Sequence, residues 1–196
     1  MTTNCNLLVI GGSAGSLEII SNILSNLKTD LRFPVIIVLH RKSHVDSILT
    51  DLFSSKTTLP VKEADEKDFL EAGCIYIAPA DYHLLVENDR TLSLDFSEKV
   101  NFSRPSIDVT FQTAADVFGN TVACLLLSGA SSDGTEGLKM VKNRGGLTIV
   151  QSPSTAEVAY MPQQAVSAVQ IDFIIDAADI PKFINGFSDV PNNSLK

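Results

Sequence analysis

The stretch that decides the fold lies near the start of the chain and reads Leu7-Leu8-Val9-Ile10-Gly11-Gly12-Ser13-Ala14-Gly15. Apolar residues in succession, with no polar alternation, are typical of a strand that is buried on both faces. Two glycines end this run, and apolar residues at helical spacing begin at Leu17. The stretch therefore predicts a buried strand, a sharp turn and a helix, which together form the first unit of a parallel α/β sheet.

The same alternation of apolar runs and amphipathic stretches continues along the chain. Strands are expected over residues 35–39, 74–78, 122–127, 147–150 and 173–175, a hairpin over 84–86 and 91–94, and helices over 17–27, 45–53, 106–118, 135–144, 162–169 and 180–187. This order predicts one three-layer, doubly wound α/β domain over residues 3–188, with a mostly parallel sheet and one antiparallel hairpin. A polar tail is expected over residues 189–196.

The composition excludes several classes of protein. The chain has 196 residues, of which 44% are hydrophobic and 19% charged, so a packed core is expected and disorder is not. The net charge of −8 opposes binding to nucleic acid and to an acidic membrane surface. The apolar runs are too short to span a bilayer, so we expect no membrane insertion.

The cysteines point to a reducing compartment and away from a metal. Cys5, Cys74 and Cys124 are isolated and form no C-x-x-C pair, so we expect no zinc site, and we interpret Cys74 and Cys124 as small core residues. Met1-Thr2-Thr3-Asn4 carries no basic segment, so no secretory leader is expected either. The sequence thus predicts a cytoplasmic protein without a metal or a cofactor.

The first candidate site residue is Ser13, because function in such a sheet lies at the carboxyl ends of the strands. Gly11-x-Ser13-x-Gly15 matches a nucleophile elbow, whose sharp turn projects the serine hydroxyl and aims backbone amides into the site. Two other readings stay open, a glycine-rich turn that binds phosphate and a turn with a structural role only. A dinucleotide fingerprint is incomplete, since Ser13 stands where its second glycine belongs.

His40 and Asp133 follow two further strands. His40 suits a general base or a satisfied structural histidine, and Asp133 suits a helix cap or a group that orients a histidine. The remaining histidines, His44 and His83, are interpreted as solvated and as shaping a loop. Hydroxyl, imidazole and carboxylate at three strand ends form a constellation for acyl transfer. We expect Ser13 Oγ to hydrogen-bond one ring nitrogen of His40, with the other nitrogen facing Asp133.

Taken together, these motifs resemble the catalytic domain of the bacterial chemotaxis protein-glutamate methylesterases, the CheB family. The matching stretches run in the family's order and cover nearly the whole chain: Val9-Ile10-Gly11-Gly12-Ser13-Ala14-Gly15, Val38-Leu39-His40, Tyr76-Ile77-Ala78-Pro79 with His83, Arg104-Pro105-Ser106-Ile107-Asp108, Leu127-Ser128-Gly129 through Asp133-Gly134, and Gln151 with Met161-Pro162. The resemblance implies that Ser13 is the nucleophile, His40 the base and Asp133 its partner. It also suggests Arg104 for the substrate rim, with an arginine that pins residues 96–106 as the alternative.

The resemblance implies hydrolysis of γ-glutamyl methyl esters on the cytoplasmic helices of chemoreceptors, with deamidation of receptor glutamines as a second activity. It implies these helices, and a receptor methyltransferase, as partners. No receiver domain is expected, because the chain starts just before its first strand. The chain departs from the family at Ala14-Gly15-Ser16, where Thr-Gly-Gly is usual, and at Gly129-Ala130-Ser131, where Gly-Met-Gly is usual.

Both departures border the expected oxyanion donors, the backbone amides of Ala14 and Ala130. Backbone donors survive a change of side chain, so the leading hypothesis remains a serine esterase. Two alternatives from other classes stay open. One is a non-catalytic interaction module of a sensory array that retains the methylesterase fold, and the other is a domain that binds phosphate or a nucleotide through the glycine-rich turn.

Overall fold

The main sheet has seven parallel strands in the computed structural model, which describes residues 4–41 and 46–189. They are β1 (Leu7–Gly12), β2 (Val35–Leu39), β3 (Val61–Glu63), β4 (Ile75–Ile77), β7 (Val122–Leu126), β8 (Leu147–Gln151) and β9 (Phe173–Ile175). Their order in the sheet is β3-β4-β2-β1-β7-β8-β9. Strands β2, β3 and β4 thus lie on one side of β1, and the later strands β7, β8 and β9 lie on the other.

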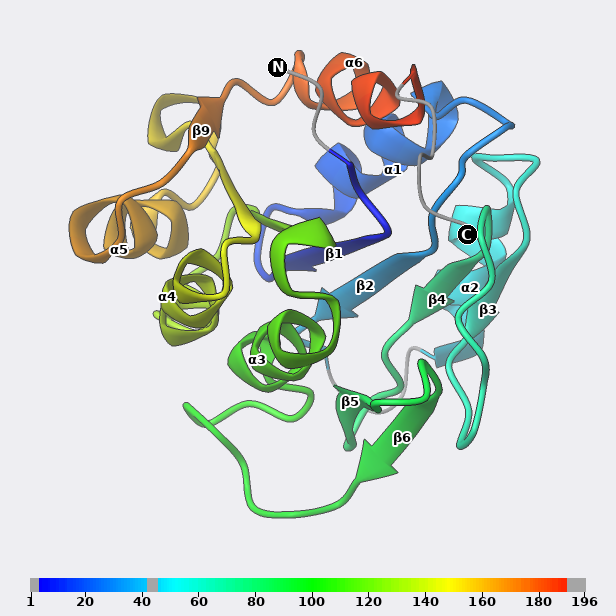
Figure 1. Ribbon diagram of the computed structural model, residues 1–196. Coiled ribbons are helices and arrows are strands. Elements are labelled where there is room, and N and C mark those ends of the chain that lie inside the picture. The colour runs from blue at the N-terminus through cyan, green and yellow to red at the C-terminus, as the bar shows by residue number, and fades with distance from the viewer. Residues whose placement is uncertain (1–3, 42–45, 190–196) are drawn as a thin grey trace.

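Helices cover both faces of this sheet (Figure 1). They are α1 (Leu17–Asn26), α2 (Asp46–Ser54), α3 (Ile107–Phe118), α4 (Thr135–Asn143), α5 (Tyr160–Ala168) and α6 (Ile180–Asn185), with short 3-10 turns at Gly119–Thr121, Pro153–Thr155 and Gly186–Asp189. Alternate residues of β1 enter two separate cores. Leu7 and Val9 pack with α3, α4 and α5, whereas Leu8 and Ile10 pack with α1, α2 and α6. Burial on both faces explains why the strands read as continuous apolar runs.

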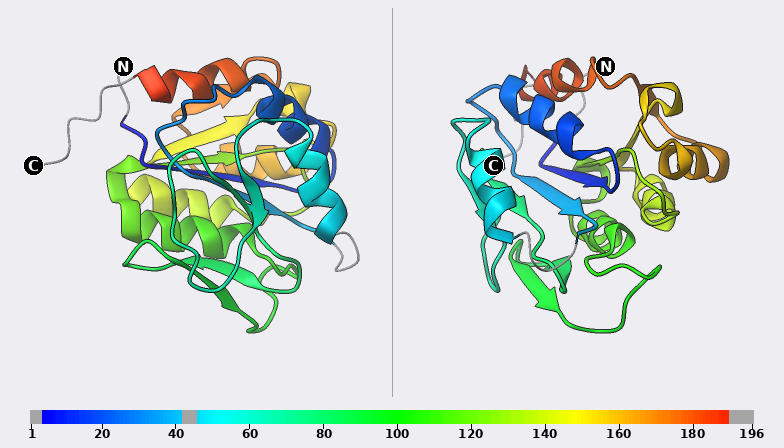
Figure 2. Two further views of the ribbon diagram at one scale, coloured as in Figure 1. Left: turned by 90° about the vertical axis from the view of Figure 1, so that its right-hand side faces the viewer. Right: turned by 180° about the vertical axis from the view of Figure 1, so that it is seen from behind.

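An antiparallel hairpin of β5 (His83–Val86) and β6 (Leu92–Asp95) packs outside α3. The Thr110 hydroxyl of α3 donates to the carbonyl of Leu84 at 2.8 Å, and the Val86 amide donates to the Thr113 hydroxyl at 3.1 Å. Figure 2 shows this hairpin projecting from the α3 side of the molecule. From its second strand the chain crosses to α3 over the carboxyl end of the sheet.

The strand order reverses between β1 and β7, which are hydrogen-bonded neighbours. After β1 the chain moves to β2 on one side, and after β7 it moves to β8 on the other. Such a reversal opens a crevice at the carboxyl ends of the two strands, where open α/β sheets bind ligands. The amide of His40 donates to the carbonyl of Gly12 at 3.2 Å, which brings the end of β2 to the same place.

The predicted fold class is confirmed, with corrections to single elements. The edge strand β3 was not predicted, because its three residues are only partly buried and carry no apolar run. Helix α5 begins at Tyr160, two residues before the predicted start. Cys74 and Cys124 are buried and unpaired, as predicted for core residues. His44, residues 1–3 and residues 190–196, which include most of the predicted tail, lie outside the described residues.

Candidate active site

Ser13 sits on a tight turn directly after β1. Its amide donates to the carbonyl of Ser128 at 2.9 Å, which ties the turn to the end of β7. The hydroxyl of Ser16 donates back to the Ser13 carbonyl at 2.6 Å, and Ser16 is fully buried. Ser16 therefore adds a hydrogen bond inside the elbow.

Two glycines let neighbouring segments approach this turn. Gly15 has φ 76°, and a Cβ there would lie 2.6 Å from Glu157 Cβ. A Cβ on Gly129 would lie 2.7 Å from Met161 Cε and 3.0 Å from Ser13 Cβ. Only glycine fits such contacts without displacing its neighbours, so Ser13 packs directly on the loop that follows β7.

His40 and Asp133 form a close pair. His40 Nε2 lies 2.7 Å from Asp133 Oδ2, and the exposed fractions of the two side chains are 13% and 0%. The prediction that one ring nitrogen of His40 faces Asp133 is thereby confirmed. The His40 side chain is therefore partly accessible to solvent, whereas the Asp133 carboxylate is fully buried.

The expected hydrogen bond between Ser13 and His40 is absent. Among the side chains that the structure describes, which are those of residues 4–41 and 48–188, Ser13 Oγ is too far from both ring nitrogens of His40 to form a hydrogen bond. Nδ1 instead faces the hydroxyl of Ser103 at 3.4 Å. This half of the prediction is wrong for the conformation described, because Ser103, on the loop before α3, occupies the nitrogen that was assigned to Ser13.

Asp133 also anchors the first turn of α3. Its Oδ2 accepts from the amide of Ile107 at 2.7 Å, and its Oδ1 accepts from the amide of Asp108 at 3.1 Å and from the Ser106 hydroxyl at 2.8 Å. Helix α4, which follows Asp133 in sequence, has Gly134 at its N-cap and no side-chain cap. The cap alternative is therefore wrong for α4. The carboxylate satisfies amides of a different helix, where negative charge is favourable.

A second carboxyl group, Asp108, lies beside Asp133. The Asn101 amide joins them, since its Nδ2 donates to Asp108 Oδ2 at 2.8 Å and to Asp133 Oδ1 at 3.3 Å. Asp108 Oδ1 accepts from the amide of Gly137 at 2.7 Å. One buried network thus links the loop before α3 to the starts of both α3 and α4.

The two carboxyl groups have opposite pKa shifts. Burial opposes ionisation of Asp133, but the hydrogen bonds from His40 and from the amides of Ile107 and Asp108 outweigh it and lower the pKa of Asp133 to about 2. Burial, aided by the charge of Asp133, raises the pKa of Asp108 to about 7. Asp133 is therefore the permanent anion that faces His40, and Asp108 ionises near neutrality.

Four residues of this network, Asn101, Ser103, Ser106 and Asp108, were not predicted as site residues from the sequence. A signal was present for two of them, because Ser106 and Asp108 open a predicted helix and lie in a stretch that carries part of the resemblance described above. Asn101 and Ser103 lie in the irregular loop, where no periodic pattern relates them to His40 or Asp133. Only the path of the folded loop shows that relation.

His83 shapes a loop, as predicted. It is buried; its Nδ1 accepts from the amide of Ser106 at 3.1 Å, and its Nε2 donates to the carbonyl of Glu98 at 3.0 Å. These bonds fasten the start of α3 to the loop that precedes it. His83 thereby supports the position of the Asp133 network without touching His40.

Arg104 is engaged with its own loop. Its Nη1 donates to the carbonyls of Phe96 at 3.1 Å and Ser97 at 2.6 Å, and its Cζ lies 3.9 Å from the centre of the Phe96 ring. These contacts agree with the alternative that Arg104 pins residues 96–106. The assignment to the substrate rim stays a prediction.

The amides assigned to an oxyanion site are available for a ligand. Ala14 and Ala130 are exposed, and within residues 4–41 and 48–188 neither amide donates to a protein acceptor. The Ser131 hydroxyl, at a second departure from the family pattern, accepts from the amide of Asp133 at 3.1 Å and braces this turn. The oxyanion role of these amides remains a prediction.

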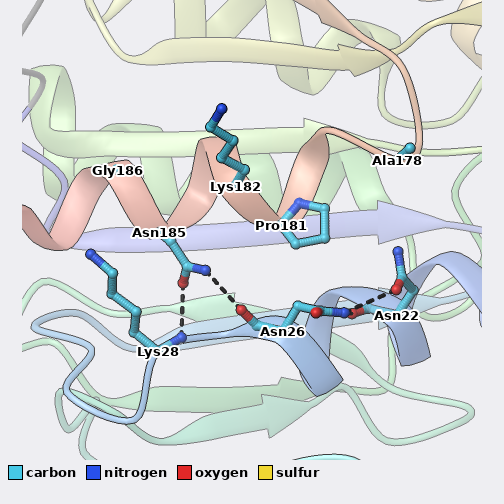
Figure 3. A pocket seen from close by; sticks show the side chains of 8 residues that line it. All are labelled: Asn22, Asn26, Lys28, Ala178, Pro181, Lys182, Asn185 and Gly186. Atoms are coloured by element: carbon cyan, nitrogen blue, oxygen red, sulfur yellow. Dashed lines mark hydrogen bonds between the residues drawn. The ribbon is translucent and has the colours of Figure 1, made fainter.

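A polar cavity of about 660 Å³ lies elsewhere, between α1 and α6. Asn185 donates to the carbonyl of Asn26 at 2.7 Å and accepts from the amide of Lys28 at 2.8 Å, as Figure 3 shows. Asn185 therefore satisfies backbone groups at the end of α1. None of the predicted site residues lines this cavity.

The described residues also bear on metal binding and on insertion into a membrane. Among the described residues, no group of three or more His, Cys, Asp or Glu side chains could hold a metal ion. No helix in the described part of the chain has the length and apolar character needed to cross a bilayer.

Comparison with known proteins identifies the family. The family described as CheB methylesterase matches residues 8–184. A Leptospira interrogans protein named "Putative protein-glutamate methylesterase/protein-glutamine glutaminase" is 42% identical over 193 residues, which cover 98% of each chain. A Thermotoga maritima protein-glutamate methylesterase/protein-glutamine glutaminase is 32% identical over 90% of this chain, which spans only 52% of that relative.

A solved structure shares the fold. The crystal structure of the Thermotoga maritima CheB methylesterase catalytic domain superimposes with a TM-score of 0.88 at 31% sequence identity. The match covers 93% of this chain and 98% of the solved chain. The seven-stranded sheet and its helices are therefore the architecture of that catalytic domain.

Proposed function

The chain belongs to the CheB methylesterase family, and we propose that it is a serine hydrolase that demethylates glutamate γ-methyl esters on the cytoplasmic helices of chemoreceptors. The observation that carries the proposal is the 2.7 Å contact between His40 and the buried Asp133, beside the turn that presents Ser13. Substrates of this kind place the reaction in the cytoplasm, with a receptor methyltransferase as the enzyme that forms the ester.

In the proposed reaction, Ser13 Oγ attacks the ester carbonyl carbon while His40 takes the hydroxyl proton. The amides of Ala14 and Ala130 donate to the resulting oxyanion. The bond to the methoxy oxygen then breaks, and His40 returns the proton so that methanol leaves. Water, deprotonated by His40, then attacks the acyl-serine carbonyl; the bond to Ser13 Oγ breaks, His40 returns the proton to Ser13 Oγ, and the glutamate carboxylate is released. Asp133 stays ionised throughout and stabilises the imidazolium form of His40.

The mechanism requires one movement from the conformation described. His40 Nδ1 faces Ser103 at 3.4 Å, so the ring or the Ser13 side chain must turn before proton transfer. A hydrogen bond of that length is weak and readily exchanged. Catalytic hydrogen bonds are often loose without substrate and tighten only in the complex.

The same acyl chemistry extends to amides. A glutamine γ-amide presents the same carbonyl to Ser13, and protonation by His40 would release ammonia in place of methanol. We therefore include deamidation of receptor glutamines in the proposal, in keeping with the glutaminase activity that the names of the relatives carry.

One observation favours a second candidate, a module that keeps the fold but has weak or no activity. Ser13 and His40 are not hydrogen-bonded in the described part of the chain. A module of this kind would still bind receptor helices. It would release no methanol from them.

Methanol release from methylated receptor fragments separates these candidates. We expect release by the wild type and none above background by Ser13→Ala, which should fold normally because Ser13 Oγ makes no hydrogen bond to His40. An activated phosphonate should label the wild type and spare the variant. Binding of the fragments without release would support the inactive module. Nucleotide binding without labelling would support the phosphate-loop alternative.

A further inference from the structure

A tight turn crosses the site between β6 and α3. The Val100 amide donates to the Ser103 carbonyl at 3.2 Å, and the Ser103 amide donates to the Val100 carbonyl at 2.9 Å. The two residues between them, Asn101 and Phe102, have φ 50° and 63°. Both central residues of this two-residue hairpin are therefore left-handed, a geometry for which Asn-Gly is the favoured pair.

Phe102 is the unexpected residue in this turn. The left-handed conformation brings the Cβ of an ordinary residue too close to its own carbonyl, so glycine would be less strained there. Packing does not explain the phenylalanine, because 97% of its surface is exposed. A strained residue with no structural contact is a reason to look for function.

The residues on either side hold the turn against the proposed catalytic pair. Asn101 Nδ2 donates to Asp133 at 3.3 Å and to Asp108 at 2.8 Å. Ser103 Oγ lies 3.4 Å from His40 Nδ1. Phe102 lies between these two anchors in the sequence, so its exposed ring is carried by a backbone turn that is held next to the His40–Asp133 pair.

We propose that Phe102 is a specificity-determining residue, whose ring packs on apolar side chains that flank the esterified glutamate of a protein substrate. The inference rests on the proposed function and deepens it. A protein substrate must extend beyond the reacting atoms, and the turn that carries Phe102 contacts both members of the proposed catalytic pair. An aromatic ring on a rigid backbone supplies contact area at little entropic cost.

The neighbouring rim has the same character. Phe96, which is 65% exposed, lies under the Arg104 guanidinium, and its ring centre is 5.5 Å from that of Tyr82. Val100, in the same turn as Phe102, is 37% exposed. Exposed apolar side chains therefore gather on and beside the loop that carries Phe102, which suits the apolar flank of a helix.

Phe102→Gly tests the proposal, because it should leave the stability of the fold unchanged or increase it while it weakens binding of the protein substrate. Glycine relieves the left-handed strain, so Tm should stay the same or rise by about 2–4 °C. The KM for a methylated receptor helix fragment should rise about fivefold or more, the loss expected from one good apolar contact. Hydrolysis of a small activated ester should change less than about twofold.

Two control variants sharpen the experiment. Phe102→Leu keeps an apolar side chain and should retain most of the affinity for the fragment. Ile174→Ala removes an apolar side chain that is 51% exposed on β9, at the far edge of the sheet, and should leave KM unchanged. A lower Tm with equal losses on both substrates would show that Phe102 has a structural role and would overturn the proposal.

Binding separates this inference from the proposed function. The dissociation constant of a fluorescent methylated helix fragment is measured for Ser13→Ala and for Ser13→Ala with Phe102→Gly. Weaker binding by the double variant supports the inference even if the wild type proves to have no turnover. Equal affinities, or no binding by Ser13→Ala, overturn it. Self-association of the wild type that Phe102→Gly abolishes would overturn it too, since the occupant would be a second copy of the chain.

Discussion

His40 Nε2 and Asp133 Oδ2 lie 2.7 Å apart although 93 positions separate the residues in the sequence. The same Oδ2 accepts from the amide of Ile107 at 2.7 Å, so the group that orients the histidine also anchors α3. Catalytic geometry and helix position therefore depend on one carboxylate. A change at Asp133 should affect both activity and stability.

The first prediction concerns Asp133→Asn. Asparagine offers one acceptor oxygen and no charge, so bonds from His40 or from the α3 amides are lost, and each hydrogen bond to a charged group contributes about 1.5–3 kcal/mol. We expect turnover to fall by about 10³–10⁴ and Tm to fall as well. Ester hydrolysis at a temperature where the variant is folded, together with thermal melting, checks both effects.

Ser13→Ala is the matched control for this prediction. It should lose activity to a similar degree with little change in Tm, because Ser13 Oγ has no hydrogen bond to His40 in the described part of the chain. Near-normal turnover of folded Asp133→Asn would reduce Asp133 to an anchor for α3 and remove it from the mechanism.

The second prediction concerns Ser103, whose hydroxyl lies 3.4 Å from His40 Nδ1. A neutral hydrogen bond contributes about 0.5–1.5 kcal/mol, so its loss should make the ring nitrogen more available to Ser13. We expect Ser103→Ala to raise kcat for a small activated ester by about two- to fivefold. Ser103→Thr keeps the hydroxyl and serves as the control. A tenfold loss in Ser103→Ala would mean that Ser103 positions the histidine productively.

The central strands were predictable because a strand that is buried on both faces consists mainly of consecutive apolar residues. Continuous apolar runs located β2 (Val35–Leu39) and β9 (Phe173–Ile175) with their observed bounds. The edge strand β3 was not predictable, because Val61-Lys62-Glu63 contains no apolar run, whereas the opposite edge strand β9 consists of Phe173-Ile174-Ile175. The local pattern thus predicts a strand where consecutive residues are apolar, whatever its burial in the sheet.

The site was predictable only where residues follow strands. His40 directly follows β2 and Asp133 lies on the segment between β7 and α4, so the topology of the parallel sheet brings them to the same edge. Asn101 and Ser103 reach the same place through a left-handed turn in an irregular loop, and no rule of spacing connects them to the strands. The side-chain direction of His40 was likewise not predictable, because it depends on that loop.

The third prediction concerns Arg104, whose guanidinium binds the carbonyls of Phe96 and Ser97. Arg104→Ala should loosen the apolar rim and weaken hydrolysis of a receptor fragment about three- to tenfold, while a small activated ester is spared. Arg104→Lys keeps the positive charge but cannot bind both carbonyls while it stacks on the Phe96 ring. It should therefore restore hydrolysis of the receptor fragment only in part. Equal losses on both substrates would indicate damage to the catalytic centre. No loss on either would remove Arg104 from the functional account.

The last prediction concerns the pH dependence of stability and rests on Asp108. Its pKa is raised from 3.8 to about 7 by burial and by the charge of Asp133, so the folded protein retains a proton that the unfolded chain releases. Protonated Asp108 therefore stabilises the fold fully below pH 3.8, and this contribution is lost as the pH rises through about 7. Asp133 acts in the opposite sense, because its pKa is lowered to about 2 and its contribution is lost only as the pH falls toward that value.

Asp108→Asn removes the titration at position 108 but keeps a side chain of the same shape. The Tm of the wild type minus that of Asp108→Asn should be largest near pH 4 and should shrink steadily toward pH 8, across the window set by 3.8 and about 7. Asp116→Asn, an exposed carboxylate of the same helix paired with Arg144, is the control for removing one negative charge. A difference that stays constant between pH 4 and pH 8 would contradict the prediction, because it would mean that Asp108 binds no additional proton on folding.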